Sequence, residues 1–119
     1  MRFHIGDITS ITSGKLLSPK RMEGIYNILN YLTGDNLYTH ELPNASRFCK
    51  PYLLKQYPEL SKINKEEITT ENHKEFLNNL IKEYGEYLEI DNIVEEWNNR
   101  NKFKDSVILT NKFNLIIIN

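Results

Sequence analysis

A chain of 119 residues, of which 39% are hydrophobic and 26% charged, has the size and composition of one globular domain and is too apolar to be disordered. Its formal net charge of −1 argues against a general nucleic-acid binder, which would carry a basic excess, and against a mimic of the DNA phosphate backbone, which would carry an acidic one. The single cysteine, Cys49, excludes an internal disulfide and a cysteine-based zinc cluster, and we expect it to be a small buried hydrophobic residue.

The N-terminal residues predict a strand followed by a turn. Residues 2–6 alternate between polar and apolar side chains and break at Gly6, which predicts a short edge strand. Asp7 is expected to cap a short turn that runs through Ser13 and ends at Gly14.

Three signals predict a helix from Ser18 to Thr33. Ser18 at the N-cap and Pro19 at the first helical position are typical start signals, and Gly34 can end the helix in the left-handed conformation. The apolar residues at helical spacing, which should form the buried face, are Met22, Ile25, Leu29 and Leu32.

The middle of the chain predicts a loop, an interrupted helix and a polar connection. Residues 35–44 have no period and are expected to form a loop. A second helix should run from about Ala45 to Tyr57, kinked or split by Pro51 and stopped by Pro58. Its inward residues should be Phe48, Tyr52, Leu53 and Tyr57. Residues 60–70 are expected to be a polar connection.

In the last part of the chain, Thr70 is expected to cap a helix that ends at Gly85. Residues 87–90 alternate and predict a strand, after which Asp91 should cap a short helix. The residues expected to face inward from the two helices are Phe76, Leu77, Leu80, Ile81 and Tyr84 in the first and Ile93, Val94 and Trp97 in the second.

Two β-branched runs near the end of the chain, residues 107–109 and 115–118, predict a C-terminal β-hairpin. Because consecutive isoleucines point to both faces of a strand, this hairpin should lie centrally in the sheet or form a homodimer contact. The fold expected for residues 1–119 is therefore a single α+β domain. It should have three to four helices packed on a small, mainly antiparallel sheet, with the hairpin at its C-terminal end.

Membrane attachment and bound cofactors are not indicated. No N-terminal run resembles a signal peptide, and no apolar stretch reaches the roughly 18 residues that a membrane span needs. The histidines His4, His40 and His73 show no metal-ligand spacing. We therefore expect a cytoplasmic protein without a metal, a cofactor or a membrane contact.

The loop after the first long helix is the main candidate binding site. It contains Asp35, Asn36, Tyr38, Thr39, His40 and Glu41. His40 could form an acid–base pair with Asp35 or Glu41, because a carboxylate can orient an imidazole that titrates near neutral pH. The same residue types also bond loop backbone groups and cap helix ends, and no nucleophile is identifiable, so no catalytic residue is assigned.

Basic residues in the first half form a second candidate, a basic patch of Lys15, Lys20, Arg21, Arg47 and Lys50. Tyrosines lie among them in the sequence, and basic groups interleaved with aromatic rings can bind single-stranded nucleic acid. Alternatively, these cations cover solvated faces while the tyrosines fill the core. The Gly14–Lys15 pair is interpreted as a turn, because the upstream glycine that a phosphate-binding loop needs is absent and Thr9 and Ser10 stand there instead.

Several stretches of the sequence resemble an uncharacterised bacteriophage and prophage protein family with a TGDxLxTHxLP motif, which here is Thr33 to Pro43. Others are Ile5-Gly6-Asp7, residues 12–18, Gly24-Ile25-Tyr26 and the region from Pro51 to Leu60. The resemblance covers residues 1–90 and leaves 91–119 as a C-terminal extension. The chain departs from the family pattern at Glu41, Asn44 and Tyr57.

The resemblance implies a phage origin but no activity. A small, near-neutral phage protein without a recognisable active site most often works by binding, so we expect a binding protein rather than an enzyme. The expected partner is a host protein, such as a CRISPR effector or another component of bacterial immunity, which the protein would block. The alternatives are a ligand-binding or enzymatic domain centred on residues 35–43 and a nucleic-acid-binding module.

Overall fold

The structure is a computed structural model that describes residues 1–100, and the predicted hairpin at 107–109 and 115–118 lies outside these residues. The described part is mostly helical and contains one small sheet. Its elements are β1 (Arg2–His4), α1 (Ile5–Ser13), α2 (Met22–Thr33), α3 (Leu42–Gln56), α4 (His73–Tyr84) and β2 (Tyr87–Glu89). Short 3-10 turns span Thr39–Glu41, Pro58–Lys62 and Lys65–Glu67, and residues 94–100 are helical.

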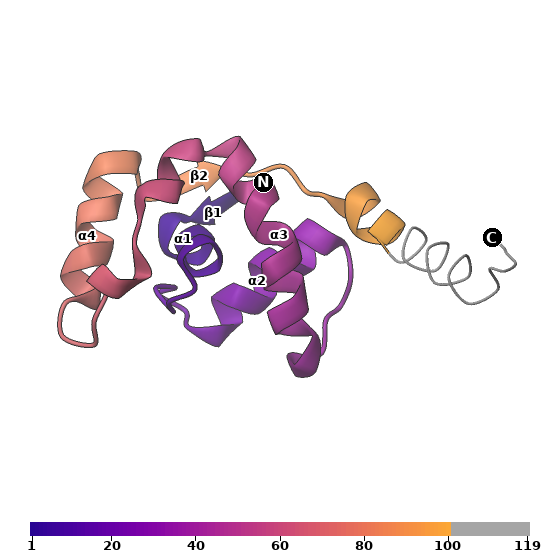
Figure 1. The fold of residues 1–119 in the computed structure, drawn as a ribbon, viewed down its shortest axis with the longest axis horizontal. Coiled ribbons are helices and arrows are strands. Elements are labelled where there is room, and N and C mark those ends of the chain that lie inside the picture. Colours follow the sequence, from indigo (N-terminus) through magenta and orange to yellow (C-terminus); the bar gives the residue numbers. More distant parts are fainter. Residues whose placement is uncertain (101–119) are drawn as a thin grey trace, which may run out of the picture.

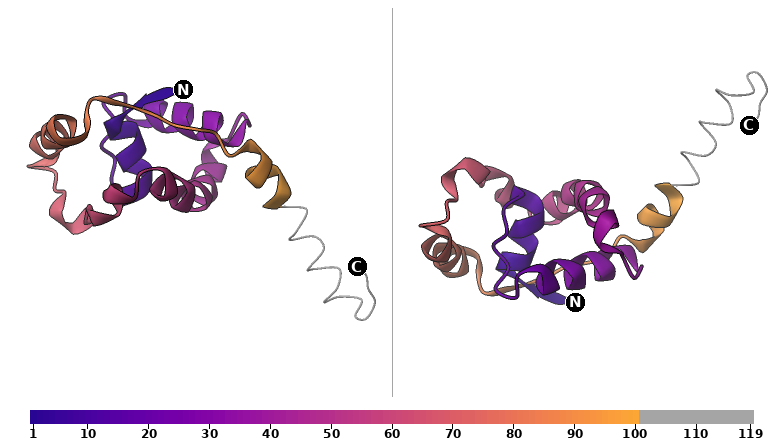
Figure 2. Two further views of the ribbon diagram at one scale, coloured as in Figure 1. Left: turned by 90° about the horizontal axis from the view of Figure 1, so that it is seen from above. Right: turned by 90° about the horizontal axis from the view of Figure 1, so that it is seen from below.

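The sheet confirms both predicted strands, but it is too small to be the platform on which the helices pack. β1 and β2 pair antiparallel, with Phe3 opposite Leu88. Two strands of three residues offer little surface, so the helices bury their apolar faces mainly against one another. α1 lies between α4 on one side and the α2–α3 pair on the other, and it contacts all three (Figures 1 and 2). The α+β class therefore holds. Residues 1–100 contain five α-helices, namely α1 to α4 and residues 94–100, where the sequence predicted three to four.

α1 replaces the short turn that the sequence predicted. The helix begins directly after β1, and the N-cap is His4, whose Nδ1 accepts a hydrogen bond from the Gly6 amide at 2.9 Å. All nine residues of α1 are buried. Thr9 and Ser10 donate their hydroxyl protons to the carbonyls of residues 5 and 6, at 2.8 and 2.6 Å, so these polar side chains are satisfied in the core. Gly14 ends the helix as predicted, at φ 81°.

α2 starts four residues later than predicted, because Ser18 does not cap it. The Ser18 hydroxyl instead donates to Oδ1 of Asp7 at 2.5 Å, and both side chains are buried between α1 and α2. Asp7 correspondingly lies in the first turn of α1 rather than capping a helix. Met22 is exposed, contrary to the prediction, whereas the buried positions Ile25, Leu29 and Leu32 and the left-handed Gly34 are confirmed.

Gly24 allows α2 to approach the Asp7–Ser18 pair closely. A Cβ atom at this position would lie 2.0 Å from the Ser18 hydroxyl oxygen and 2.4 Å from Asp7 Oδ1. These distances are far below van der Waals contact, so only glycine fits here without a shift of its neighbours.

α3 is one helix rather than two pieces, and it begins three residues earlier than predicted. Pro43 occupies its first turn, where a missing amide proton leaves no hydrogen bond unmade, and Pro51 lies inside the helix. Of the expected inward residues Leu53 is fully buried, while Phe48, Tyr52 and Tyr57 are partly buried. The predicted polar connection after α3 instead buries Leu60 and Ile68.

Cys49 lies on α3 and is fully buried in the hydrophobic core of the domain, as the sequence predicted. Burial raises the pKa of its thiol to about 12. Because the thiolate is the reactive form, we expect Ellman's reagent to modify the folded protein at least about 100-fold more slowly than the urea-unfolded protein. Equal rates in the two states would show that the Cys49 thiol is accessible in the folded protein, contrary to this prediction.

α4 forms one end of the described domain. It starts at His73, and Thr70 does not cap it; the turn before it is held by mutual bonds between Thr69 and Asn72, at 2.7 and 3.1 Å. Of the five residues predicted to face inward, Leu80 is buried and the other four are partly buried, because α1 is the main helix against which α4 packs. Gly85 follows the helix as predicted.

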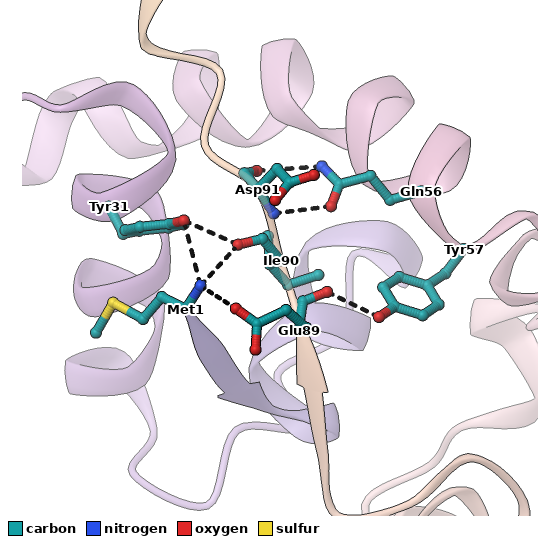
Figure 3. A network of polar contacts seen from close by, with 7 residues as sticks. All are labelled: Met1, Tyr31, Gln56, Tyr57, Glu89, Ile90 and Asp91. Atoms are coloured by element: carbon teal, nitrogen blue, oxygen red, sulfur yellow. Dashed lines mark hydrogen bonds and ion pairs between the residues drawn. The ribbon is translucent and has the colours of Figure 1, made fainter.

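The chain after β2 crosses the domain from the end near α4 to the end where residues 94–100 are helical (Figure 2). A polar network fixes this crossing to α2 and α3 (Figure 3). Tyr31 and Tyr57 donate to the carbonyls of Ile90 and Glu89, at 2.8 and 2.7 Å. The Gln56 side-chain amide exchanges two hydrogen bonds with the Asp91 backbone, at 2.9 and 3.1 Å. Asp91 is therefore part of this crossing and does not cap the next helix.

Candidate functional site

The candidate binding loop, residues 35–43, is the tight turn that joins α2 to α3. Gly34 adopts φ 74° and ends α2, and Leu37 anchors the turn with a buried side chain. The Leu37 amide donates to Oδ1 of Asn30 at 3.0 Å, which ties the turn back to α2. The segment is thus shorter than the predicted loop, because Thr39–Glu41 forms a 3-10 turn and α3 begins at Leu42.

Asp35 holds the helix of residues 94–100 against this turn. Its Oδ2 accepts a hydrogen bond from the indole Nε1 of Trp97 at 2.7 Å. Trp97 is 2% exposed and meets the Phe48 ring edge-on, with 5.4 Å between the ring centroids. The Asp35 carboxylate therefore has a structural partner 62 residues away in the sequence.

Glu41 and Thr39 also bond within the protein. Oε1 of Glu41 accepts from the Tyr38 amide at 2.8 Å, and the Glu41 amide donates to the Tyr38 carbonyl at 2.9 Å. The Thr39 hydroxyl bonds the hydroxyl of Tyr26 on α2. Neither carboxylate of the segment bonds His40 within residues 1–100, so the structure does not assemble the acid–base pair that the sequence suggested.

The outward face of the segment is a stacked pair of rings, which we call the Tyr38–His40 pair. Tyr38 is 70% exposed, and the two rings lie nearly parallel, at an interplanar angle of 7° and a centroid separation of 5.9 Å. Asn36, two residues before Tyr38 in the chain, is also exposed. A stacked pair of exposed rings with polar edges offers a large contact area with few rotatable bonds, so this arrangement is suited to binding.

The residues of the predicted basic patch line three separate hollows. Lys15 and Arg21 line one of about 560 Å³ together with Glu66, Glu71 and His73. Lys20 and Arg2 line one of about 470 Å³ that also holds Asp7 and Glu86. Arg47 and Lys50 line a third of about 440 Å³, and its lining contains no carboxylate. The third hollow is therefore the most positive of the three.

Sequence reasoning missed several residues of this third hollow, namely Thr12, Ser13, Ser46, Ser61 and Lys65. They come from α1, α3 and the two 3-10 turns after α3, and no spacing in the sequence relates them. Only a prediction of how α1 packs against α3 could have found them.

Residues 1–100 contain neither a metal-binding cluster nor a helix that could span a membrane. No three histidine, cysteine, aspartate or glutamate side chains gather closely enough to hold a metal ion. Within the same residues, no helix has the length and apolar character needed to cross a membrane.

Comparison with known proteins gave one match. Residues 3–63, about half of the chain, match a family model described as "Domain of unknown function (DUF7736)". Neither the curated proteins nor the solved structures gave a significant match. The matched region runs from β1 to the turn after α3, so it includes the Tyr38–His40 pair and most of the third hollow.

Proposed function

We propose that this chain, which belongs to the family of the domain of unknown function DUF7736, is an accessory protein that binds and inhibits a host protein. The observation that carries this proposal is the Tyr38–His40 pair. Tyr38 is the most exposed large hydrophobic side chain of residues 1–100, and it stands on a turn that is anchored on both sides.

The bonding within the turn supports binding over catalysis. The carboxylates of Asp35 and Glu41 accept hydrogen bonds from Trp97 and from the backbone of Tyr38, at 2.7 and 2.8 Å. An acid–base role would need one of them to orient His40. The same bonds hold the turn in one conformation, which lowers the entropy lost when a partner docks on it.

A protein is the partner that best fits this surface. Tyrosine is enriched at the energetic centres of protein interfaces, where its ring buries a large area and its hydroxyl keeps a polar contact. Neither ring lines any of the three hollows described above, so a small ligand held in one of these hollows would not contact the pair.

The resemblance of residues 33–43 to the phage family motif supports a phage origin, and with it a target in the cytoplasm of a bacterial host. Among host proteins, the target that we propose is a component of bacterial immunity, such as a CRISPR effector. This assignment rests on origin, whereas the position of the binding surface rests on the geometry of the turn.

The test is capture of the host protein by wild-type and Tyr38→Ala protein, followed by an assay of the captured protein's own activity. We expect the variant to bind at least about tenfold more weakly, since truncation of an interface hot spot costs 2 kcal/mol or more. Met22→Ala, which removes an exposed side chain from α2, should bind like wild type.

Both variants should keep the wild-type denaturant midpoint, because exposed substitutions usually change stability by less than about 0.5 kcal/mol. Undiminished capture and inhibition by folded Tyr38→Ala protein would rule out this surface. Self-association that the substitution abolishes would instead make the pair a homodimer contact.

A further inference from the structure

The third hollow has the construction of an anion site, and we refer to it as the α1–α3 hollow. Its wall on α3 is formed by Ser46, Arg47 and Lys50, which lie at helical spacing on one side of the helix. The end of α1 supplies Thr12 and Ser13, the two 3-10 turns after α3 supply Ser61 and Lys65, and Asn64 caps the second of these turns.

The charge of the hollow is uncompensated. Arg47, Lys50 and Lys65 line it, and no carboxylate does. The ion pairs found within residues 1–100 are those of Met1 with Glu89 and His4 with Glu86, so none of these three cations is in an ion pair there. The Arg47 guanidinium has a neutral partner, since Nη2 donates a hydrogen bond to Oδ1 of Asn44. Glu66, the acidic neighbour of Lys65, lines the hollow that contains Lys15 instead. Like charges around one hollow repel, and a bound anion would relieve that repulsion.

Two neutral polar groups of the hollow, Ser13 and Asn64, keep unused donors, whereas the Ser61 hydroxyl already donates to the Pro58 carbonyl at 2.8 Å. Oγ of Ser13 already accepts the Lys15 amide at 3.1 Å, which leaves its proton free to donate. Oδ1 of Asn64 accepts the Glu66 amide at 3.0 Å, which leaves the NH₂ group free. The Thr12 hydroxyl oxygen is buried and has no hydrogen-bond partner among residues 1–100, so one more polar group in this wall is unsatisfied. Free donors beside unpaired cations match the oxygens of a phosphate.

The rest of the wall is apolar. Ile11 and Leu60 are buried, and Leu54 and Ile63 are half-buried at its surface. The volume of about 440 Å³ lies in the range of small-molecule sites. We propose that the α1–α3 hollow binds a nucleoside phosphate, with the phosphates held by Arg47, Lys50 and Lys65 and the base against Leu54 and Ile63. This inference goes beyond the proposed function and uses none of the residues of the Tyr38–His40 pair.

Isothermal titration calorimetry with ADP tests the proposal. Wild-type protein should bind ADP, and Arg47→Gln/Lys50→Gln should bind it at least about tenfold more weakly, since two charge-assisted contacts are lost. Lys65→Gln, on a different element, should also weaken binding. The matched control Lys55→Gln/Lys74→Gln removes the same charge from exposed positions outside the hollow and should bind like wild type.

Further probes separate the ligand classes. Adenosine should bind weakly or not at all, and inorganic phosphate should bind more weakly than ADP because it lacks the base. Absence of ADP binding at millimolar concentration would overturn the proposal. So would a loss of ADP affinity in Lys55→Gln/Lys74→Gln as large as the loss in Arg47→Gln/Lys50→Gln. A ten-residue oligothymidylate that binds more tightly than ADP, and loses affinity in Arg47→Gln/Lys50→Gln, would make the hollow part of a nucleic-acid surface instead. Tyr38→Ala should leave ADP binding unchanged, so failure here is distinguishable from failure of the proposed function.

Discussion

Replacing Trp97 with alanine is expected to destabilise the protein by about 3–5 kcal/mol, the usual range for removal of a buried tryptophan. Trp97 is 2% exposed, contacts the Phe48 ring and donates to Asp35 at 2.7 Å. It therefore attaches the helix of residues 94–100 to the α2–α3 turn. Urea denaturation followed by circular dichroism measures the loss.

Two milder variants separate the contribution of the hydrogen bond to the free energy of unfolding from the contribution of packing. Trp97→Phe keeps most of the apolar contact, and Asp35→Ala removes the acceptor, so each should cost about 1–3 kcal/mol. The double variant should cost less than the sum, because both changes break the same bond. Trp97 is the only tryptophan in the chain, so Asp35→Ala should also shift the fluorescence emission.

A Trp97→Ala variant that loses less than about 1 kcal/mol would show that residues 94–100 do not pack on the domain in solution. The same variant should also weaken capture of a host protein, since Asp35 helps to position the turn that carries Tyr38. This second effect depends on the proposed function, whereas the stability loss does not.

Replacing Gly24 with alanine is expected to cost about 2–4 kcal/mol, although alanine is the better helix former by about 1 kcal/mol. The added methyl group would overlap Ser18 and Asp7, at 2.0 and 2.4 Å. Relief of that overlap would break the buried Asp7–Ser18 hydrogen bond, so α1 and α2 would move apart or lose this bond. The denaturant midpoint measures the effect.

The control for this prediction is the same substitution in a Ser18→Ala background. Without the Ser18 hydroxyl the nearest overlap is removed, so Gly24→Ala should cost clearly less there than in wild type. Equal costs in the two backgrounds would show that Gly24 does not face Ser18. An increase in stability on Gly24→Ala alone would show that only helix propensity matters at this position.

Features set by a few neighbouring residues were predictable from the sequence alone. Gly14, Gly34 and Gly85 each follow a helix and adopt a positive φ. The sequence predicts this, because the absence of a Cβ atom in the residue itself is what makes positive φ favourable. The buried residues Ile25, Leu29 and Leu32 of α2 and both strands also follow from local periodicity, whereas Met22, predicted from the same periodicity, is exposed. The same local rules find the segment 35–43, because glycine, proline and short polar residues mark a turn.

Tertiary structure decided which partner each polar side chain takes. Ser18 has the right neighbours for an N-cap, yet it bonds Asp7, because packing of α1 on α2 buries both groups together and a buried carboxylate needs a donor. Asp35 is exposed, and it bonds Trp97 instead of His40 because the buried indole N–H of Trp97 needs an acceptor. The α1–α3 hollow likewise exists only where three separate elements meet. Local sequence sets what a residue can bond, and burial in the folded chain selects among the options, because an unpaired polar group is costly only where water is excluded.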